Sequence, residues 1–237
     1  MKKTNFIDTD NFIKQNFILT EQSKKDFDLI QHMQDVFVGI GEREGWQHNS
    51  VGGAPCQMDL RFIYSMVSLV KPKKVIEIGT WSGLSAHVIA LAMSRYADDF
   101  QIDTCDVANV YQSPEEFKWL GRRINFYNNH STKFLNNLKD KEYDFIFSDA
   151  SLTDQDAKLM KKKIISDDKL FFMTHDVYPN KYEKGNQALD ILKYSFNNVE
   201  NFCFIPNKLD VGYNVDGKMI NSCTAFLIAE EVYDGIK

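Results

Sequence analysis

The chain has 237 residues, of which 43% are hydrophobic and 26% are charged, and this composition is typical of a globular domain rather than a disordered, collagen-like or coiled-coil chain. The length suits one α/β domain with an additional segment. A formal charge of −5 gives the protein no overall positive field, so we expect no nucleic-acid partner.

Signals for export or membrane insertion are not recognisable. Asn5, Asp8 and Asp10 interrupt the apolar run that a signal peptide needs, and no stretch has the spacing of a membrane-spanning helix. The cysteines stand apart, without the spacing of a zinc site or a disulfide scaffold. We therefore expect a cytoplasmic protein with reduced thiols that has no membrane partner.

The first 55 residues predict a helical cap and a glycine-rich segment. From Thr20 onward apolar residues recur at helical spacing, and Gly39 and Gly41 are expected to end this helix. The broken stretch 39–55 is expected to form a linker or a mobile lid over a site. A second helix is predicted for residues 57–70, ahead of the main α/β domain.

After Pro72, short apolar runs alternate with helical patterns. The expected strands are 74–78, 100–105, 124–126, 143–147, 170–173, 202–205 and 224–229. The expected helices between them are 82–96, 114–120, 132–138, 154–165 and 186–196. Such alternation predicts a doubly wound, mostly parallel, Rossmann-like sheet with helices on both faces, and ligands bind beyond the carboxyl ends of its strands.

The segment 74–85, KVIEIGTWSGLS, carries the most informative motif. A buried strand runs into Gly79, a tight turn follows, and a helix is expected to begin with Ser82 or Ser85 near its cap. Free backbone N–H groups at the helix start favour an anionic ligand. The bulky Trp81 suits a carboxylate better than a pyrophosphate. The alternative is a structural strand–turn–helix corner in which the glycines serve only the turn.

The pattern Glu77-Ile-Gly79-x-x-x-Gly83-x-Ser85 resembles the first motif of class I S-adenosylmethionine-dependent methyltransferases. It is most similar to the small-molecule O-methyltransferase branch, which includes metal-dependent catechol-type enzymes. In that family the loop holds the methionine part of the cofactor, and the preceding acid helps to position it. The resemblance implies cofactor contacts for Glu77, Gly79, Thr80, Trp81, Ser82, Gly83 and Ser85. Taken alone, Glu77 could equally be a solvated acid at a strand end.

The same resemblance implies a seven-stranded sheet in the order 3-2-1-4-5-7-6 with an antiparallel last strand. It divides the chain into a helical cap with a lid or linker over residues 1–55 and a methyltransferase domain over residues 56–237.

An acid at the end of the second expected strand is the candidate for ribose binding. Asp106 can accept both ribose hydroxyl hydrogens, and its separation from Gly79 fits one crossover. Asp103 competes, but it sits in mid-strand, where a solvent-facing acid on an edge is the ordinary explanation. We therefore prefer Asp106.

The family also places a loop after its third strand against the adenine, commonly with an acid. Here that place holds Asn129 and His130, either of which could hydrogen-bond the adenine amino group or N1. A turn rich in Asn and Ser needs no such role.

Two later strand ends carry the candidate chemistry. Asp149 corresponds to the family's acid that faces the transferred methyl group and binds Mg²⁺ in metal-dependent members, which implies catalytic, cofactor and metal contacts for it. His175 and Asp176 stand where catechol-type enzymes have an Asp-Asn pair that completes the metal site. Two carboxylates could hold a divalent cation. Alternatively His175, with an ordinary pKa near ~6.5, could remove the acceptor's proton while Asp176 orients it, or the pair could be structural.

The resemblance implies an O-methyltransferase that acts on a hydroxyl of a small metabolite and uses S-adenosylmethionine. The hydroxyl would be activated either by Mg²⁺ or another divalent metal, or by a histidine that acts as a base. A homo-oligomer is compatible with it. Two alternatives stay open: a hydroxylase-like or aminopropyl-transferring enzyme on the same scaffold, and a non-catalytic cofactor-binding subunit. The second is favoured if Asp149, His175 and Asp176 lie far from the cleft.

Overall fold

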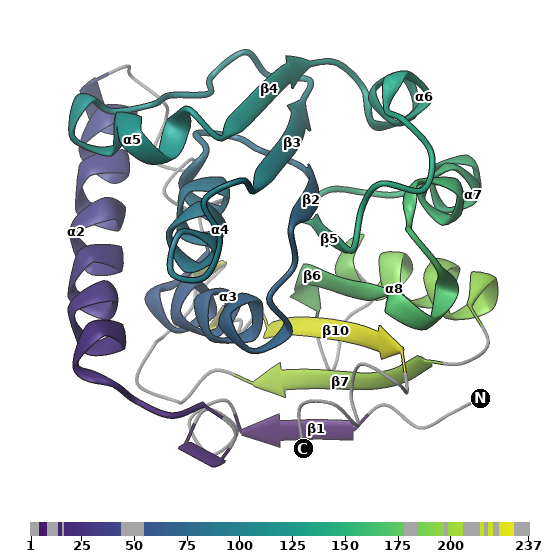
Figure 1. Ribbon diagram of the computed structural model, residues 1–237, viewed down its shortest axis with the longest axis horizontal. Helices are drawn as coiled ribbons and strands as arrows, with labels where there is room; N and C mark the ends of the chain where they lie inside the picture. The colour runs from purple at the N-terminus through teal and green to yellow at the C-terminus, as the bar shows by residue number, and fades with distance from the viewer. Residues whose placement is uncertain are drawn as a thin grey trace.

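A central sheet lies between two layers of helices (Figure 1). The computed structural model describes residues 5–8, 14–15, 17–43, 55–177, 184–196, 199–205, 214–215, 218–219 and 223–229. In this part of the chain no helix combines the length and the apolar character that crossing a membrane would require.

The sheet formed by the described residues has eight strands in the order β1-β7-β10-β6-β5-β2-β3-β4. Its strands are β1 (Asn5–Asp8), β2 (Lys74–Ile78), β3 (Gln101–Asp106), β4 (Ile124–Asn128), β5 (Phe145–Ser148), β6 (Phe171–Val177), β7 (Val199–Ile205) and β10 (Cys223–Ala229). The strands from β6 to β4 pair in parallel, whereas β10 runs antiparallel to both of its neighbours. Apart from β1, this is the predicted order with its antiparallel last strand, so the predicted fold is confirmed.

The N-terminal strand β1 was not predicted. It lies at the edge of the sheet and pairs in parallel with β7, with Asn5 opposite Phe202 and Asp8 opposite Ile205. Four residues are too short a run for apolar periodicity to reveal a strand. Part of the segment assigned to a helical cap therefore extends the sheet, while the division of the chain at residue 55 stays a prediction. A short hairpin, β8 (Asn214–Val215) with β9 (Lys218–Met219), lies between β7 and β10.

The helices divide between the two faces of the sheet (Figure 1). One face is covered by α2 (Glu21–Arg43), α3 (Gln57–Val70), α4 (Leu84–Met93) and the short α5 (Lys118–Gly121), which follows the 3-10 turn Glu115–Phe117. The other face is covered by α6 (Ser131–Asn137), α7 (Asp154–Lys163) and α8 (Lys184–Ser195), with a 3-10 turn at Asp167–Lys169 before β6. Every residue of α4 is buried, because α2 and α3 cover the side that the sheet leaves open.

Helix α2 is longer than the sequence predicts. It begins after Thr20, whose hydroxyl accepts the N–H of Ser23 at 3.1 Å, but it continues through Gly39 and Gly41 to Arg43. A glycine lowers the stability of a helix by about 1 kcal/mol. Packing of the buried face of α2, which includes Phe37, offsets this loss. Residues 44–54, which make up most of the predicted linker or lid, lie outside the described residues.

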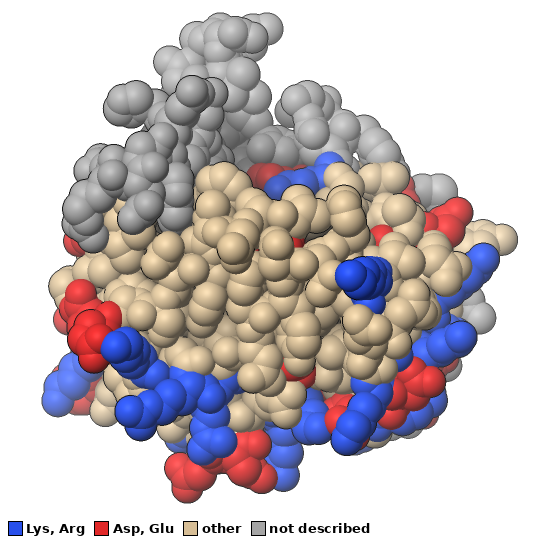
Figure 2. Space-filling model, turned by 90° about the horizontal axis from the view of Figure 1, so that it is seen from above, with Lys and Arg blue, Asp and Glu red and all other residues tan. Residues whose placement is uncertain are grey.

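Charged side chains gather along one rim of the face shown in Figure 2, where basic and acidic groups lie beside one another. The middle of this face carries few charges. The basic residues seen here therefore do not form one continuous positive surface.

Candidate active site

The parallel strands bring most of the predicted site residues to one edge of the sheet, because their carboxyl ends share that edge. The positions at this edge are Gly79 after β2, Asp106 at the end of β3, Asn129 after β4, Asp149 after β5 and Asp176 near the end of β6.

Two glycines shape the loop between β2 and α4. Gly79 has φ of +92°, and a Cβ there would lie 2.8 Å from the carbonyl oxygen of Asp149. Gly83 has φ of +98°, and its Cβ would lie 2.7 Å from the ring of Tyr111. Since other residues rarely adopt such φ values, both positions require glycine. The close approach at Gly79 sets Asp149 directly beside the loop.

The first turn of α4 begins at this loop. Its N-cap is Gly83, whereas the sequence suggested a serine near the cap. Gly83 has no side chain that could accept the N–H groups of the first turn, so these donors and the positive helix end suit an anionic ligand. Ser85 instead donates its hydroxyl to Oε1 of Glu77 at 2.6 Å.

Glu77 is fully buried, so it is not the solvated acid that was the alternative interpretation. Besides the bond from Ser85, it accepts the hydroxyl of Thr104 at 2.5 Å and so joins β2 to β3 and α4. Burial raises the pKa of Glu77 to about 7; the two hydroxyl donors lower it, and the charges of Asp149 and Asp106 raise it further.

We expect Glu77→Gln to remove a pH dependence of stability. The folded-state pKa is about 7 against an ordinary 4.5, so as the pH rises the unfolded chain loses this proton first. The free energy of unfolding should therefore fall by about 3 kcal/mol between these two pKa values and then level off. Urea denaturation across this range measures the fall, which should be smaller in the variant. The control Glu115→Gln, at a side chain that is 84% exposed, should behave like the wild type. Equal slopes in Glu77→Gln and the wild type would contradict the raised pKa.

Asp106 holds the glycine loop against β3. One of its carboxylate oxygens accepts the N–H of Trp81 at 2.8 Å, and the other accepts the N–H of Ala108 at 2.8 Å. Trp81 has φ of +47°, which is uncommon for a non-glycine residue, and the bond to Asp106 helps to hold it there. A carboxylate has about four acceptor sites, so Asp106 keeps capacity for a ligand's hydroxyl groups.

The competing acid Asp103 is accounted for by the fold. It is 1% exposed and accepts hydrogen bonds from Asn125 at 3.0 Å, Tyr127 at 3.2 Å and Tyr143 at 2.8 Å. The expectation of a solvent-facing acid at this position was therefore wrong, because Tyr127 on β4 and Tyr143, which precedes β5, cover it.

The predicted adenine residues lie next to Asp106 but at the margin of the site. The backbone N–H of Asn129 donates to the carbonyl of Asp106 at 3.0 Å. His130 is exposed and stands at the N-cap of α6. Neither lines the pocket formed by the loop, so their adenine contacts stay a prediction.

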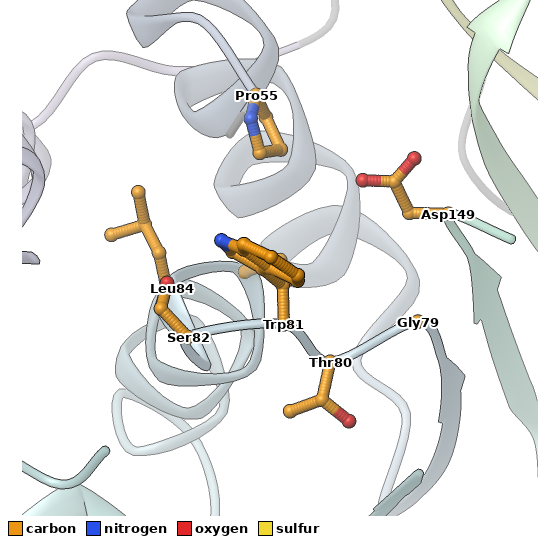
Figure 3. A pocket seen from close by; sticks show the side chains of 8 residues that line it. Pro55, Gly79, Thr80, Trp81, Ser82, Leu84 and Asp149 are labelled. Carbon is orange, nitrogen blue, oxygen red and sulfur yellow. The ribbon is translucent and has the colours of Figure 1, made fainter. Parts of the chain in front are cut away.

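A pocket opens between the glycine loop and the end of β5 (Figure 3). It encloses about 230 Å³ including its open mouth, and the indole of Trp81 and the carboxylate of Asp149 both border it. Its lining consists of Pro55, Gly79, Thr80, Trp81, Ser82, Leu84, Ser85 and Asp149. The predicted cofactor loop and the first catalytic candidate thus face one space.

Behind Asp149 lies a cluster of ionisable side chains. The Nδ1 atom of His175 lies 3.4 Å from Oδ1 of Asp149 and 3.3 Å from Oδ1 of Asp176. Its Nε2 atom lies 3.2 Å from Oδ2 of Asp59 on α3. The ammonium of Lys184, the first residue of α8, lies 2.8 Å from Oδ1 of Asp149 and 3.0 Å from Oδ2 of Asp176. Three acids and two basic groups therefore meet beside the pocket.

The surroundings of His175 favour its charged form. Burial would lower its pKa, but the carboxylates of Asp149 and Asp59 raise the pKa well above the ordinary 6.5. Burial likewise opposes ionisation of Asp149, while His175 and Lys184 hold its pKa below the usual value. The role of His175 as a base stays a prediction.

The predicted metal ligands are close together, but the cluster does not fit a divalent ion. One ligand atom from each of Asp149, His175 and Asp176 lies within 4.8 Å of the others, which is near enough for one ion. The Lys184 ammonium, however, already contacts a carboxylate oxygen of both aspartates. A dication held by these carboxylates would lie close to the lysine ammonium and be repelled by it.

Sequence reasoning missed Asp59 and Lys184. Asp59 is 4% exposed, and it also accepts the hydroxyl of Thr224 at 2.7 Å. A lone acid between Met58 and Leu60 on an apolar helix was a usable signal, because a buried carboxylate needs partners. Lys184 gave only a weak signal, a lysine before Gly185 in the segment that follows β6.

Comparisons with known proteins agree with this geometry. A family model described as O-methyltransferase matches residues 46–169. Probable caffeoyl-CoA O-methyltransferase 2 of Dictyostelium discoideum is 32% identical over 104 residues, which is 40% of this chain and 44% of that protein. Tapetum-specific methyltransferase 1 of Arabidopsis thaliana is 29% identical over 146 residues, 60% of each chain. The chain thus spans about half the length of the curated relatives it matches.

Solved structures share the fold at low sequence identity. The O-methyltransferase of Bacillus cereus in complex with SAH has a TM-score of 0.60 at 13% identity, with coverage of 92% of this chain and 96% of that one. The O-methyltransferase TomG of Streptomyces achromogenes in complex with SAM has a TM-score of 0.56 at 14% identity, with coverage of 93% and 95%.

Proposed function

The chain belongs to the O-methyltransferase family, and from this premise we propose that it transfers the methyl group of S-adenosylmethionine to a hydroxyl oxygen of a small molecule. One observation carries the proposal: the glycine loop that suits the cofactor and the ionised Asp149 line the same pocket. Cofactor and acceptor can therefore meet at one place.

The loop fits the methionine and ribose parts of the cofactor. At Gly79 and Gly83 the backbone comes so close to neighbouring atoms that a Cβ would collide, and the α4 start offers N–H donors to a carboxylate. Asp106, beside the loop, retains acceptor capacity for ribose hydroxyls. Two related folds, from Bacillus cereus and Streptomyces achromogenes, were solved with SAH and SAM, which supports the same ligand here.

When bound, the cofactor supplies a methyl group on a positively charged sulfur. The chain's part is to hold the acceptor oxygen in line with that methyl group, so that the O–C bond forms as the C–S bond breaks. Asp149 borders the pocket and is held ionised, so it can accept a hydrogen bond from the acceptor hydroxyl, orient the oxygen and take the hydroxyl proton as the O–C bond forms. His175 and Lys184 stabilise the charge of Asp149 from behind.

The alternative of a non-catalytic cofactor-binding subunit is not favoured. It required the predicted catalytic residues to lie far from the pocket, yet Asp149 lines the pocket, and His175 and Asp176 belong to the same cluster as Asp149. Hydroxylase-like and aminopropyl-transferring activities remain as outcomes of the test.

The test is transfer of a labelled methyl group from S-adenosylmethionine to a panel of hydroxyl-bearing metabolites. The panel should contain caffeoyl-CoA, since several relatives are named for it. We expect a labelled methyl ether and one equivalent of SAH per product. Label that stays on the cofactor with every acceptor, or transfer of an aminopropyl group from the decarboxylated cofactor, would contradict the proposal.

We expect Asp106→Ala to weaken binding of SAH by one to two powers of ten. Hydrogen bonds to a charged group contribute roughly 1.5–3 kcal/mol, and the variant also releases the N–H of Trp81. Isothermal titration calorimetry measures the change. Asp99→Ala, at an exposed acid just before β3, is the matched control and should bind SAH like the wild type. Equal affinity of Asp106→Ala and the control would remove Asp106 from the cofactor site.

A further inference from the structure

Lys184 is placed against the usual preference of helices. It is the first residue of α8, where the positive end of the helix dipole disfavours a cation. Its ammonium also donates to the carbonyl oxygen of Asp149 at 2.8 Å, in addition to its contacts with the carboxylates of Asp149 and Asp176. A lysine has three N–H donors, and three oxygens surround this one. The placement of Lys184 is thus explained by the acids and not by the helix.

The backbone around Lys184 is built for this close approach. The next residue is Gly185, where a Cβ would lie 2.2 Å from the carbonyl oxygen of His175 and 2.7 Å from the backbone of Asp176. No side chain fits there, so the first turn of α8 rests directly on the end of β6. Asp176 itself adopts φ of +58°, a conformation that is uncommon for a non-glycine residue. Helix start and strand end are therefore held together at the cluster.

We propose that the Lys184 ammonium is the resident cation of this site and takes the place of a divalent metal, so that methyl transfer by this protein is metal-independent. The measurement of methyl transfer that tests this inference rests on the proposed function, whereas the measurement of metal binding is independent of it. It departs from the sequence expectation of a metal held by Asp149, His175 and Asp176.

Charge and geometry support the replacement of a divalent metal by the Lys184 ammonium. Two carboxylates at adjacent strand ends repel each other unless a cation lies between them, and Lys184 meets that need within the chain. Mg²⁺ binds oxygens at 2.0–2.1 Å in near-octahedral geometry and keeps several waters. A divalent ion at such distances from the carboxylates of Asp149 and Asp176 would lie close to the Lys184 ammonium. The two positive charges would repel each other, so the ammonium would be displaced.

The experiment measures metal binding and metal dependence separately. Mn²⁺ is titrated into the protein, with and without SAH, and followed by electron paramagnetic resonance, which distinguishes free from bound ion. Methyl transfer is measured before and after chelation. Four proteins are compared: the wild type, Lys184→Ala, Lys184→Ala combined with Asp176→Asn, and the control Lys158→Ala, which changes an exposed lysine on α7.

We expect the wild type and Lys158→Ala to bind no Mn²⁺ at about 1 mM ion and to keep transfer within about twofold after chelation. Lys184→Ala should gain one bound Mn²⁺ per chain, lose that ion again in combination with Asp176→Asn, and lose roughly a hundredfold in transfer when metal is withheld. Circular dichroism confirms that each variant is folded.

Stoichiometric Mn²⁺ binding by the wild type, together with loss of transfer on chelation, would overturn the proposal. A folded Lys184→Ala that gains no Mn²⁺ would overturn it as well. If Lys184→Ala does not fold, the wild-type arms decide alone. Failure of the proposed function gives a different pattern, because transfer would then be absent in every protein with and without metal while Mn²⁺ binding still reports on Lys184.

Discussion

Replacing Asp149 by asparagine is expected to reduce methyl transfer by roughly a hundredfold to a thousandfold while binding of SAH changes by less than about tenfold. Asp149 is the acid that borders the pocket, and it is held ionised by His175 and Lys184. The amide has no charge to orient the acceptor hydroxyl, and it leaves the buried His175 and the half-buried Lys184 short of a partner. We therefore also expect a loss of about 3 kcal/mol in stability.

The kinetics and binding of Asp149→Asn should be read together. Single-turnover transfer and SAH calorimetry separate a role in chemistry from a role in holding the cofactor. The control Asp154→Asn changes an exposed acid at the start of α7 and should leave both unchanged. Wild-type transfer by Asp149→Asn would remove Asp149 from the reaction, and equal losses in transfer and binding would make it a cofactor residue only.

Gly79→Ala is expected to weaken SAH binding by about a hundredfold and to lower stability by about 2–4 kcal/mol. Alanine is disfavoured at φ of +92°, and its Cβ would lie 2.8 Å from a backbone oxygen of Asp149, which no side-chain rotation can relieve. Either the loop or the end of β5 must move, so the pocket changes shape.

The matched control is Gly121→Ala in α5. Its φ lies outside the positive region, and the added Cβ would meet the Oγ atom of Ser113, which can rotate away, and the Cβ atom of Ser113 at 3.1 Å, which needs only a small shift. Thermal unfolding and SAH titration should show a much smaller effect than Gly79→Ala. If Gly79→Ala bound SAH and unfolded like the wild type, the close approach of loop and β5 would not shape the site.

The fold was predictable wherever periodicity was strong and local. The strand 74–78 and the helix 57–70 have the bounds expected from their apolar spacing, and the alternation after Pro72 predicted the mostly parallel sheet. The order of its strands was implied by the family resemblance instead. The capping box of α7 is also a local feature, because the Thr153 hydroxyl accepts the N–H of Asp156 and the Asp156 carboxylate accepts the N–H of Thr153.

The remaining features depend on partners that are distant in the chain. Gly39 and Gly41 stay helical because Phe37 and its neighbours pack on other helices. Asp59 reaches His175 from 116 positions away, and Lys184 reaches Asp149 from 35 positions away. Local patterns do not encode such pairings. The sequence therefore predicted the acids at the strand ends, but not the lysine that contacts them.

The most direct test of the central claim, a methyltransferase site at the glycine loop, is calorimetric titration of the wild-type protein with SAH and, separately, with NAD. We expect one SAH to bind per chain with a dissociation constant below about 0.1 mM, and the titration with NAD to show no heat of binding. Binding of NAD together with no detectable binding of SAH at about 1 mM would contradict it.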